Sequence, residues 1–261
     1  KLWFGQWHHG STDFPYPNDR FEQWTGALHA WFDRHLQQRD VDTGPPVELF
    51  LNDGRVLTED TWPLPESSPL TLYPSAAETL ATSPGAAASA SYAADPSALF
   101  LQEPGSSIDF ESSRVSFVSA PISTDTLIAG APKLRLSLSM TSPRVDIMGT
   151  LWDMAPDGSG EKIGQGAFAM NPELRAGIDN PQPVTPGQTM VLDMEGMAQA
   201  HLLLAEHRLA LTVASADSDK TPLFAAGARV TLSLGGSDPA ALTLPVIENP
   251  ILWEDPLSPP A

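Results

Sequence analysis

The sequence predicts a mainly β protein, a β-sandwich preceded by a short segment with one strand and one helix. Apolar and polar residues alternate along many segments after residue 45, a pattern that buries one face of each strand, as in an antiparallel sandwich. Turn-forming residues are abundant, with 26 prolines and 19 glycines among 261 residues. Before residue 45 the apolar residues instead recur at helical spacing.

The sequence of the first 45 residues predicts a strand, a loop and a helix. Residues 2–7 form a short apolar stretch that ends in His8, His9 and a polar loop. Apolar side chains then recur at spacings of three and four, which gives a helix with one apolar stripe. The stripe consists of Phe21, Trp24, Leu28, Trp31, Phe32 and Leu36. One strand and one helix do not make an α/β domain alone, so this segment needs a partner sheet for its exposed stripe.

From residue 47 onward, extended segments dominate. Residues 47–51 lead into the tight-turn sequence Asn52-Asp53-Gly54, and 55–64 and 69–73 also read as extended. Residues 75–98 are rich in Ala, Ser and Pro, which predicts a surface loop. The most regular alternation lies in residues 134–140, 145–151, 209–213, 230–234 and 242–246. The sequence Pro156-Asp157-Gly158 predicts a hairpin turn.

Composition excludes several classes of function. The net charge of −18 disfavours binding to the phosphate backbone of a nucleic acid. The chain has no cysteine, which rules out disulfides, thiolate metal sites and a cysteine nucleophile. No apolar run reaches the roughly 18 residues that a membrane-spanning helix needs.

His9 is the first candidate for chemistry. A neutral imidazole just beyond a strand end can accept a proton from a serine nucleophile, provided that a carboxylate orients it. No G-x-S-x-G sequence occurs in the chain, so the nucleophile is not expected here. From the pattern alone, a structural role for His9 stays open. His8 points the other way if the segment is extended, which favours a structural role for it.

No metal site and no cofactor are expected. His29, His35, His201 and His207 show no metal-ligand spacing with one another. The stretch from Asp153 to Glu161 superficially resembles a calcium loop, but it lacks alternating acidic ligands, and a hairpin turn explains its Asp-Gly pair.

Several segments resemble one enzyme family in order and spacing. Gly5-Gln-Trp-His-His-Gly10 resembles the G-P-W-x-H-G segment of X-Pro dipeptidyl-peptidases and cocaine-esterase-like serine hydrolases, the CocE/NonD group. The helix that ends in Trp31-Phe-Asp-Arg-His-Leu36 is similar to the helix after that segment in the family. The later segments that resemble strands of the family's C-terminal domain are 46–54, 61–65, 116–121, 128–136, 151–158 and 207–213.

The resemblance implies a fold and a role for His9. The family combines an α/β-hydrolase domain with a C-terminal jelly roll of the galactose-binding type, which packs on the hydrolase domain and helps to wall the substrate cleft. On this basis residues 1–45 are the end of the hydrolase domain, 46–254 the jelly roll and 255–261 a tail. His9 matches the histidine of a Ser-Asp-His triad. The serine and aspartate would lie in an N-terminal portion before Lys1, so the chain alone is expected to be inactive.

Some questions stay open at this point. The family often has Pro where this chain has Gln6, and Gly where it has Glu206. The substrate could be a peptide that begins with X-Pro, an ester or an amide. The alternative interpretation is a non-catalytic jelly roll used for ligand binding or dimerisation, and a homo-oligomer remains an option. The compartment, cytoplasmic or secreted, is not indicated.

Overall fold

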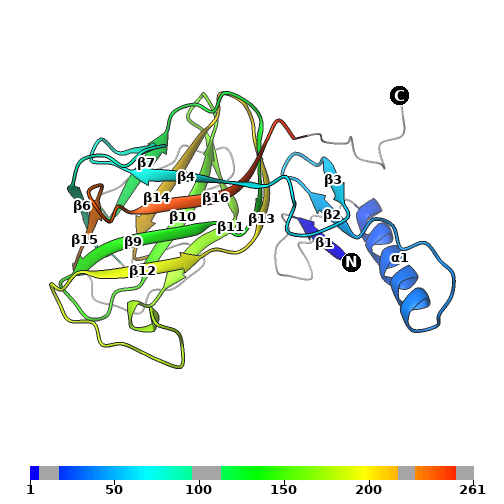
Figure 1. Ribbon diagram of the computed structural model, residues 1–261, viewed down its shortest axis with the longest axis horizontal. Coiled ribbons are helices and arrows are strands. Elements are labelled where there is room, and N and C mark those ends of the chain that lie inside the picture. Colours follow the sequence, from blue (N-terminus) through cyan, green and yellow to red (C-terminus); the bar gives the residue numbers. More distant parts are fainter. Residues whose placement is uncertain (6–17, 96–112, 217–226, 251–261) are drawn as a thin grey trace. The chain divides into compact units, whose positions relative to one another are not determined.

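The computed structural model describes residues 1–5, 18–95, 113–216 and 227–250. These residues fall into two compact units, Lys1–Glu66 and Ser67–Pro250 (Figure 1). None of the helices in these ranges has the length and apolarity needed to cross a bilayer.

The first unit is a small three-stranded sheet with one helix. Its elements are β1 (Leu2–Gly5), α1 (Asn18–His35), β2 (Val47–Phe50) and β3 (Val56–Glu59). The strand order is β1-β2-β3, with β1 parallel to β2 and β2 antiparallel to β3. Parallel neighbours require a crossover connection, and α1 lies within it. The tight turn predicted at Asn52-Asp53-Gly54 is confirmed, because the Leu51 amide donates to the Arg55 carbonyl at 2.9 Å.

Helix α1 leaves much of its predicted apolar stripe in solvent. Trp24, Leu28 and Phe32 lie four residues apart on one face of the helix and are about two-fifths exposed (39%, 39% and 42%). Leu36, just beyond the helix, continues the ridge and is 70% exposed. An apolar ridge of this kind is typical of a helix that covers more sheet than the described strands provide.

The second unit contains the remaining strands. One sheet holds β4 (Ser68–Pro74), β6 (Ala88–Ala93), β8 (Thr126–Gly130), β9 (Lys133–Met140), β12 (Met190–Glu195), β13 (Gln199–Leu203), β15 (Arg229–Leu234) and β16 (Ala241–Glu248). The other holds β5 (Thr79–Ala81), β7 (Arg114–Ser119), β10 (Ile147–Met154), β11 (Gly160–Met170) and β14 (Arg208–Ala214). A 3₁₀ turn, η1 (Pro172–Leu174), follows β11.

The two sheets form the layers of a sandwich around one core. Strand β4 pairs with β16 on one side and with β5 on the other, so it joins the two sheets. Figure 1 shows β9, β12 and β16 in one layer and β10, β11 and β14 in the other. Apolar residues from both layers are buried together, among them Leu134, Leu136 and Leu138 of β9 and Leu209, Leu211 and Val213 of β14. The predicted mainly β sandwich is confirmed, and its alternating segments are its central strands.

The prediction of a surface loop over 75–98 was wrong for two parts of it. Residues 79–81 form β5, and 88–93 form β6, which pairs antiparallel with β15. Strand β6 consists mostly of Ala and Ser, and its pairing depends on backbone hydrogen bonds rather than on large apolar side chains. Tyr92 is its one large residue, and it is 1% exposed within the core.

The predicted boundary at residues 45 and 46 does not coincide with the division between the compact units. Strand β2 begins at Val47 but pairs with β1, so it belongs to the first unit. The compact units divide between Glu66 and Ser67. The expected tail at 255–261 lies outside the described residues.

Replacement of Tyr92 by Phe tests the role of β6. The Tyr92 hydroxyl lies 3.0 Å from the Ser215 hydroxyl in a buried pair, and burial raises the pKa of Tyr92 far above its usual value. We expect Tyr92→Phe to lower the free energy of unfolding by about 1 kcal/mol, because one buried hydrogen bond is lost. Chemical denaturation would measure the change. An unchanged midpoint would show that β6 contributes no buried hydrogen bond to the core.

Candidate functional site

The sequence-predicted catalytic histidine, His9, lies outside the described residues, as does its neighbour His8. Strand β1 ends at Gly5, four positions before His9. The role assigned to His9 therefore stays a prediction.

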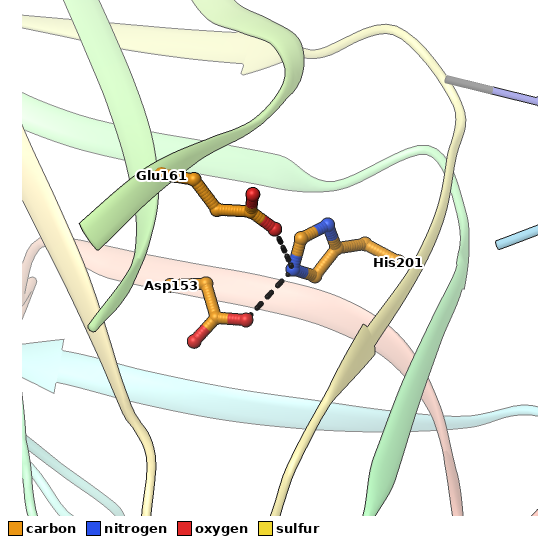
Figure 2. A group of neighbouring side chains, drawn as sticks. All are labelled: Asp153, Glu161 and His201. Atoms are coloured by element: carbon orange, nitrogen blue, oxygen red, sulfur yellow. Dashed lines mark hydrogen bonds and ion pairs between the residues drawn. The ribbon is translucent and has the colours of Figure 1, made fainter. Parts of the chain in front are cut away.

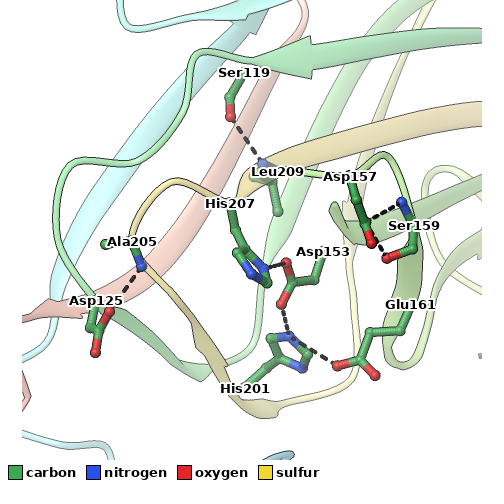
Figure 3. A network of polar contacts seen from close by, with 10 residues as sticks. All are labelled: Ser119, Asp125, Asp153, Asp157, Ser159, Glu161, His201, Ala205, His207 and Leu209. Carbon is green, nitrogen blue, oxygen red and sulfur yellow. Dashed lines mark hydrogen bonds and ion pairs between the residues drawn. The ribbon is translucent and has the colours of Figure 1, made fainter. Parts of the chain in front are cut away.

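A buried polar cluster lies instead at the rim of the sandwich core. It consists of Asp153, Glu161 and His201, with His207 beside them (Figures 2 and 3). Asp153 and His201 are 5% and 1% exposed. Such deep burial of ionisable groups is rare unless they are paired, so the cluster is the strongest candidate site among the described residues.

A hairpin places the two carboxylates opposite each other. The turn between β10 and β11 is closed by hydrogen bonds from the Ala155 amide to the Ser159 carbonyl (2.8 Å) and from the Gly158 amide to the Ala155 carbonyl (3.0 Å). Asp153 of β10 is thereby in register with Glu161 of β11. The hairpin turn predicted from this sequence is confirmed. Two like charges directly opposite each other in a ladder repel, so this pair requires compensation.

The core side of the sheet receives both carboxylates. Side chains alternate along a strand, so Asp153 lies on the same face as Leu151, and Glu161 on the same face as Ile163. Leu151 and Ile163 are both fully buried in the core. Asp153 is therefore held at the edge of an apolar interior, where an isolated charge is costly.

His201 reaches the carboxylates from the opposite sheet. It lies in β13, which pairs with β8, whereas Asp153 and Glu161 lie in the sheet of β10 and β11. Its Nε2 is 2.9 Å from Asp153 Oδ2 and 3.7 Å from Glu161 Oε1. Gly164 in β11 allows this close approach, because a Cβ at this position would collide with the Gln199 side chain of β13.

His207 holds the other oxygen of Asp153. Its Nδ1 is 2.7 Å from Asp153 Oδ1, and because an ionised carboxylate only accepts, the imidazole donates. His207 ends the turn between β13 and β14, whose backbone is tied to the neighbouring segment. The Ala205 amide donates to Asp125 Oδ1 at 2.9 Å (Figure 3). The Glu206 amide donates to the Ile122 carbonyl at 2.9 Å.

Nearby Asp157 adds a further negative charge at the hairpin tip. The Ser159 hydroxyl and amide donate to its Oδ1 at 2.6 and 2.9 Å. These hydrogen bonds, with a smaller contribution from His207, lower the pKa of Asp157 below its usual value. The site thus combines carboxylates with imidazoles, a set of groups that can bind a cation or hold a proton.

These residues were identifiable in the sequence one by one, but no sequence pattern indicates that they lie close together in space. His201 and His207 show no metal-ligand spacing with other histidines, and the stretch from Asp153 to Glu161 reads as a separate hairpin loop. The structure joins them because β13 lies against β11 across the sandwich, which no local pattern reveals. One signal in the sequence does point to the cluster. Asp153 is a charged residue two positions after Leu151, at an inward-facing position of an otherwise apolar strand.

Comparison with models of protein families identifies the family of this chain. Residues 39–245 match the model of the X-Pro dipeptidyl-peptidase C-terminal non-catalytic domain. The chain belongs to this family. The cluster around Asp153 lies within the matched residues, in a domain described as non-catalytic, whereas His9 precedes them.

Two curated relatives support this assignment. A protein of Streptomyces avermitilis that is provisionally named a Xaa-Pro dipeptidyl-peptidase is 24% identical over 266 residues, covering 84% of this chain and 38% of that protein. The cocaine esterase of a Rhodococcus species is 23% identical over 255 residues, covering 84% of this chain and 44% of the esterase. The chain thus spans less than half the length of the curated relatives it matches.

Solved structures share the fold. An α-amino acid ester hydrolase superposes with a TM-score of 0.74 at 20% identity, over 89% of this chain and 46% of that one. A CocE/NonD family hydrolase from Staphylococcus aureus gives a TM-score of 0.69 at 16% identity, over 89% of this chain and 46% of that one. These likenesses confirm the C-terminal β-sandwich that the sequence resemblance implied.

Removal of the Asp153 carboxylate should weaken the sandwich. Asp153→Ala leaves His201 and His207 without their shared carboxylate, and we expect a loss of about 3–5 kcal/mol in the free energy of unfolding. Asp193→Ala is the matched control, because Asp193 pairs with Arg135 at the exposed surface and contributes little. Equal midpoints of urea denaturation for the two variants would contradict the structural role of Asp153.

Glu206 offers a test of the turn that positions His207. Its φ of 69° lies in the left-handed region, which favours glycine. We expect Glu206→Gly to stabilise the protein by about 0.5–1 kcal/mol, because relief of strain exceeds the added freedom of the unfolded chain. Thermal unfolding would show a higher Tm. A lower Tm would mean that the glutamate side chain stabilises the turn.

Proposed function

We propose that this chain is the C-terminal part of a serine hydrolase that either releases X-Pro dipeptides from peptides or cleaves acyl esters and amides. The sandwich is its accessory domain, and His9 is its catalytic base. The match to a non-catalytic domain that is named for X-Pro dipeptidyl-peptidases supports the first part of the proposal.

The observation that carries the hydrolase assignment is the topology of the first unit. Strand β1 runs parallel to β2, with α1 in the connection between them. Parallel pairs with helical crossovers are characteristic of α/β domains, in which both faces of the sheet are covered. Among the described strands, β1 pairs with β2 alone, so its other edge can continue a larger sheet.

The position of His9 fits this topology. It follows the carboxyl end of β1, and open α/β sheets place their ligands beyond the carboxyl ends of the strands. The exposed ridge of Trp24, Leu28 and Phe32 on α1 fits a helix that packs on further strands of the same sheet.

In the proposed mechanism, His9 takes the proton of a serine hydroxyl as the serine attacks the substrate carbonyl. The imidazolium then gives this proton to the leaving amine or alcohol, and water releases the acyl group with His9 again as the base. The serine, and an aspartate that orients the imidazole, belong to the preceding part of the polypeptide. The sandwich contributes no reacting group.

Hydrolysis assays on the full-length polypeptide and on residues 1–261 alone test the proposal. The full-length protein should cleave a Gly-Pro anilide or an activated ester, and the chain alone should not. In the full-length protein, His9→Gln should lower kcat by about 10²–10⁴-fold, which is the usual contribution of a general base. His8→Gln is the matched control and should retain most activity.

Two results would overturn the assignment. Hydrolysis by residues 1–261 alone would place the nucleophile inside this chain. Full activity of His9→Gln, with an unchanged Tm, would remove His9 from the mechanism. The ratio of anilide to ester turnover decides between a dipeptidyl-peptidase and an ester hydrolase.

A further inference from the structure

We propose that Asp153, Glu161 and His201 form a binding site for a divalent transition-metal ion of the Zn²⁺ type. The site lies between the two sheets of the sandwich, and it is independent of the proposed hydrolase chemistry. One imidazole nitrogen and two carboxylate oxygens converge there, all within 4.8 Å of one another (Figure 2).

The distances suit tetrahedral coordination. Bonds of about 2.0–2.1 Å to a central ion place neighbouring ligand atoms about 3.4 Å apart. His201 Nε2 lies 2.9 Å from Asp153 Oδ2 and 3.7 Å from Glu161 Oε1, which brackets this value. Asp153 and His201 are fixed by burial, whereas the Glu161 side chain is 46% exposed and can adjust by a few tenths of an ångström. Its exposure also leaves a side from which an ion can enter.

Charge favours a cation at this point. Asp153 and Glu161 are cross-strand neighbours, and burial of the Asp153 carboxylate reduces the screening of their repulsion by water on that side. A divalent ion between them would neutralise both carboxylates.

The outer contacts resemble those of a metal site. His207 Nδ1–H donates to the second oxygen of Asp153 at 2.7 Å, which fixes the orientation of the carboxylate. Hydrogen bonds of this kind orient metal ligands and tune the affinity of the site. Metal binding requires the Nε2 lone pair of His201, so Nε2 carries no proton when the ion is bound.

The ligand set selects among metals. Calcium takes six to eight oxygen ligands, and magnesium keeps most of its water and prefers oxygen. Imidazole with carboxylates suits Zn²⁺ and its transition-metal neighbours, with water in the fourth position. We therefore expect Zn²⁺ and Co²⁺ to bind, and Ca²⁺ and Mg²⁺ not to compete.

Titration calorimetry of residues 1–261 with ZnCl₂, after treatment with EDTA, tests the proposal. One ion should bind per chain, and Glu161→Gln should weaken this binding by more than the roughly 10–100-fold that loss of an outer contact costs. Glu195→Gln, an exposed side chain at the end of β12, is the matched control and should bind as the wild type does. The Tm of Glu161→Gln in EDTA should be no lower than that of the wild type, because the substitution removes the repulsion with Asp153, and this result would show that the variant folds.

A Co²⁺ spectrum provides a second readout. The wild-type protein should give the intense visible absorption of tetrahedral Co²⁺, and Glu161→Gln should not. Equal Zn²⁺ affinity of wild type and Glu161→Gln would overturn the proposal and assign the binding to imidazoles elsewhere, such as His29 or His35. Absence of Zn²⁺ binding would also overturn it.

Discussion

A carboxylate at the edge of an apolar core requires compensating charge, and Asp153 imposes this requirement on the sandwich. The hairpin of β10 and β11 places Glu161 opposite it, which adds a second negative charge. The opposite sheet supplies His201, and the turn before β14 supplies His207. Two stretches that are distant in sequence, 153–161 and 201–207, therefore meet at one point, and their contact links the two layers by polar groups within a mainly apolar interior.

The two compact units differ in how far their described strands and helix bury their own apolar surface. In the second unit, strands from both sheets close around one core, and the buried apolar residues come from both layers. The first unit has a parallel strand pair, a helix with an exposed apolar ridge and a strand edge that can be extended. This contrast is the physical basis for regarding the first unit as part of an α/β domain and the sandwich as its accessory.

Sequence patterns predict much of the fold and little of the site. Alternation identified the central strands such as β9 and β14, because one face of each is buried and the other is not. Strand β6 was missed because Ala and Ser carry no strong apolar signal, although Tyr92 anchors it. The cluster was missed because Asp153 and His201 are 48 positions apart and meet only through the packing of two sheets. His9 was identified from a family resemblance and from its place after a strand, and its role rests on the proposed hydrolase.

A double-mutant cycle on Asp153 and His201 tests the central claim, that these residues act as a unit across the two sheets. Unfolding free energies of the wild type, Asp153→Asn, His201→Gln and the double variant would be measured in metal-free buffer. A coupling energy of about 1.5–3 kcal/mol is expected for two buried partners in one hydrogen-bonded network. Additivity of the two substitutions within about 0.5 kcal/mol would contradict the claim, because independent sites behave in that way.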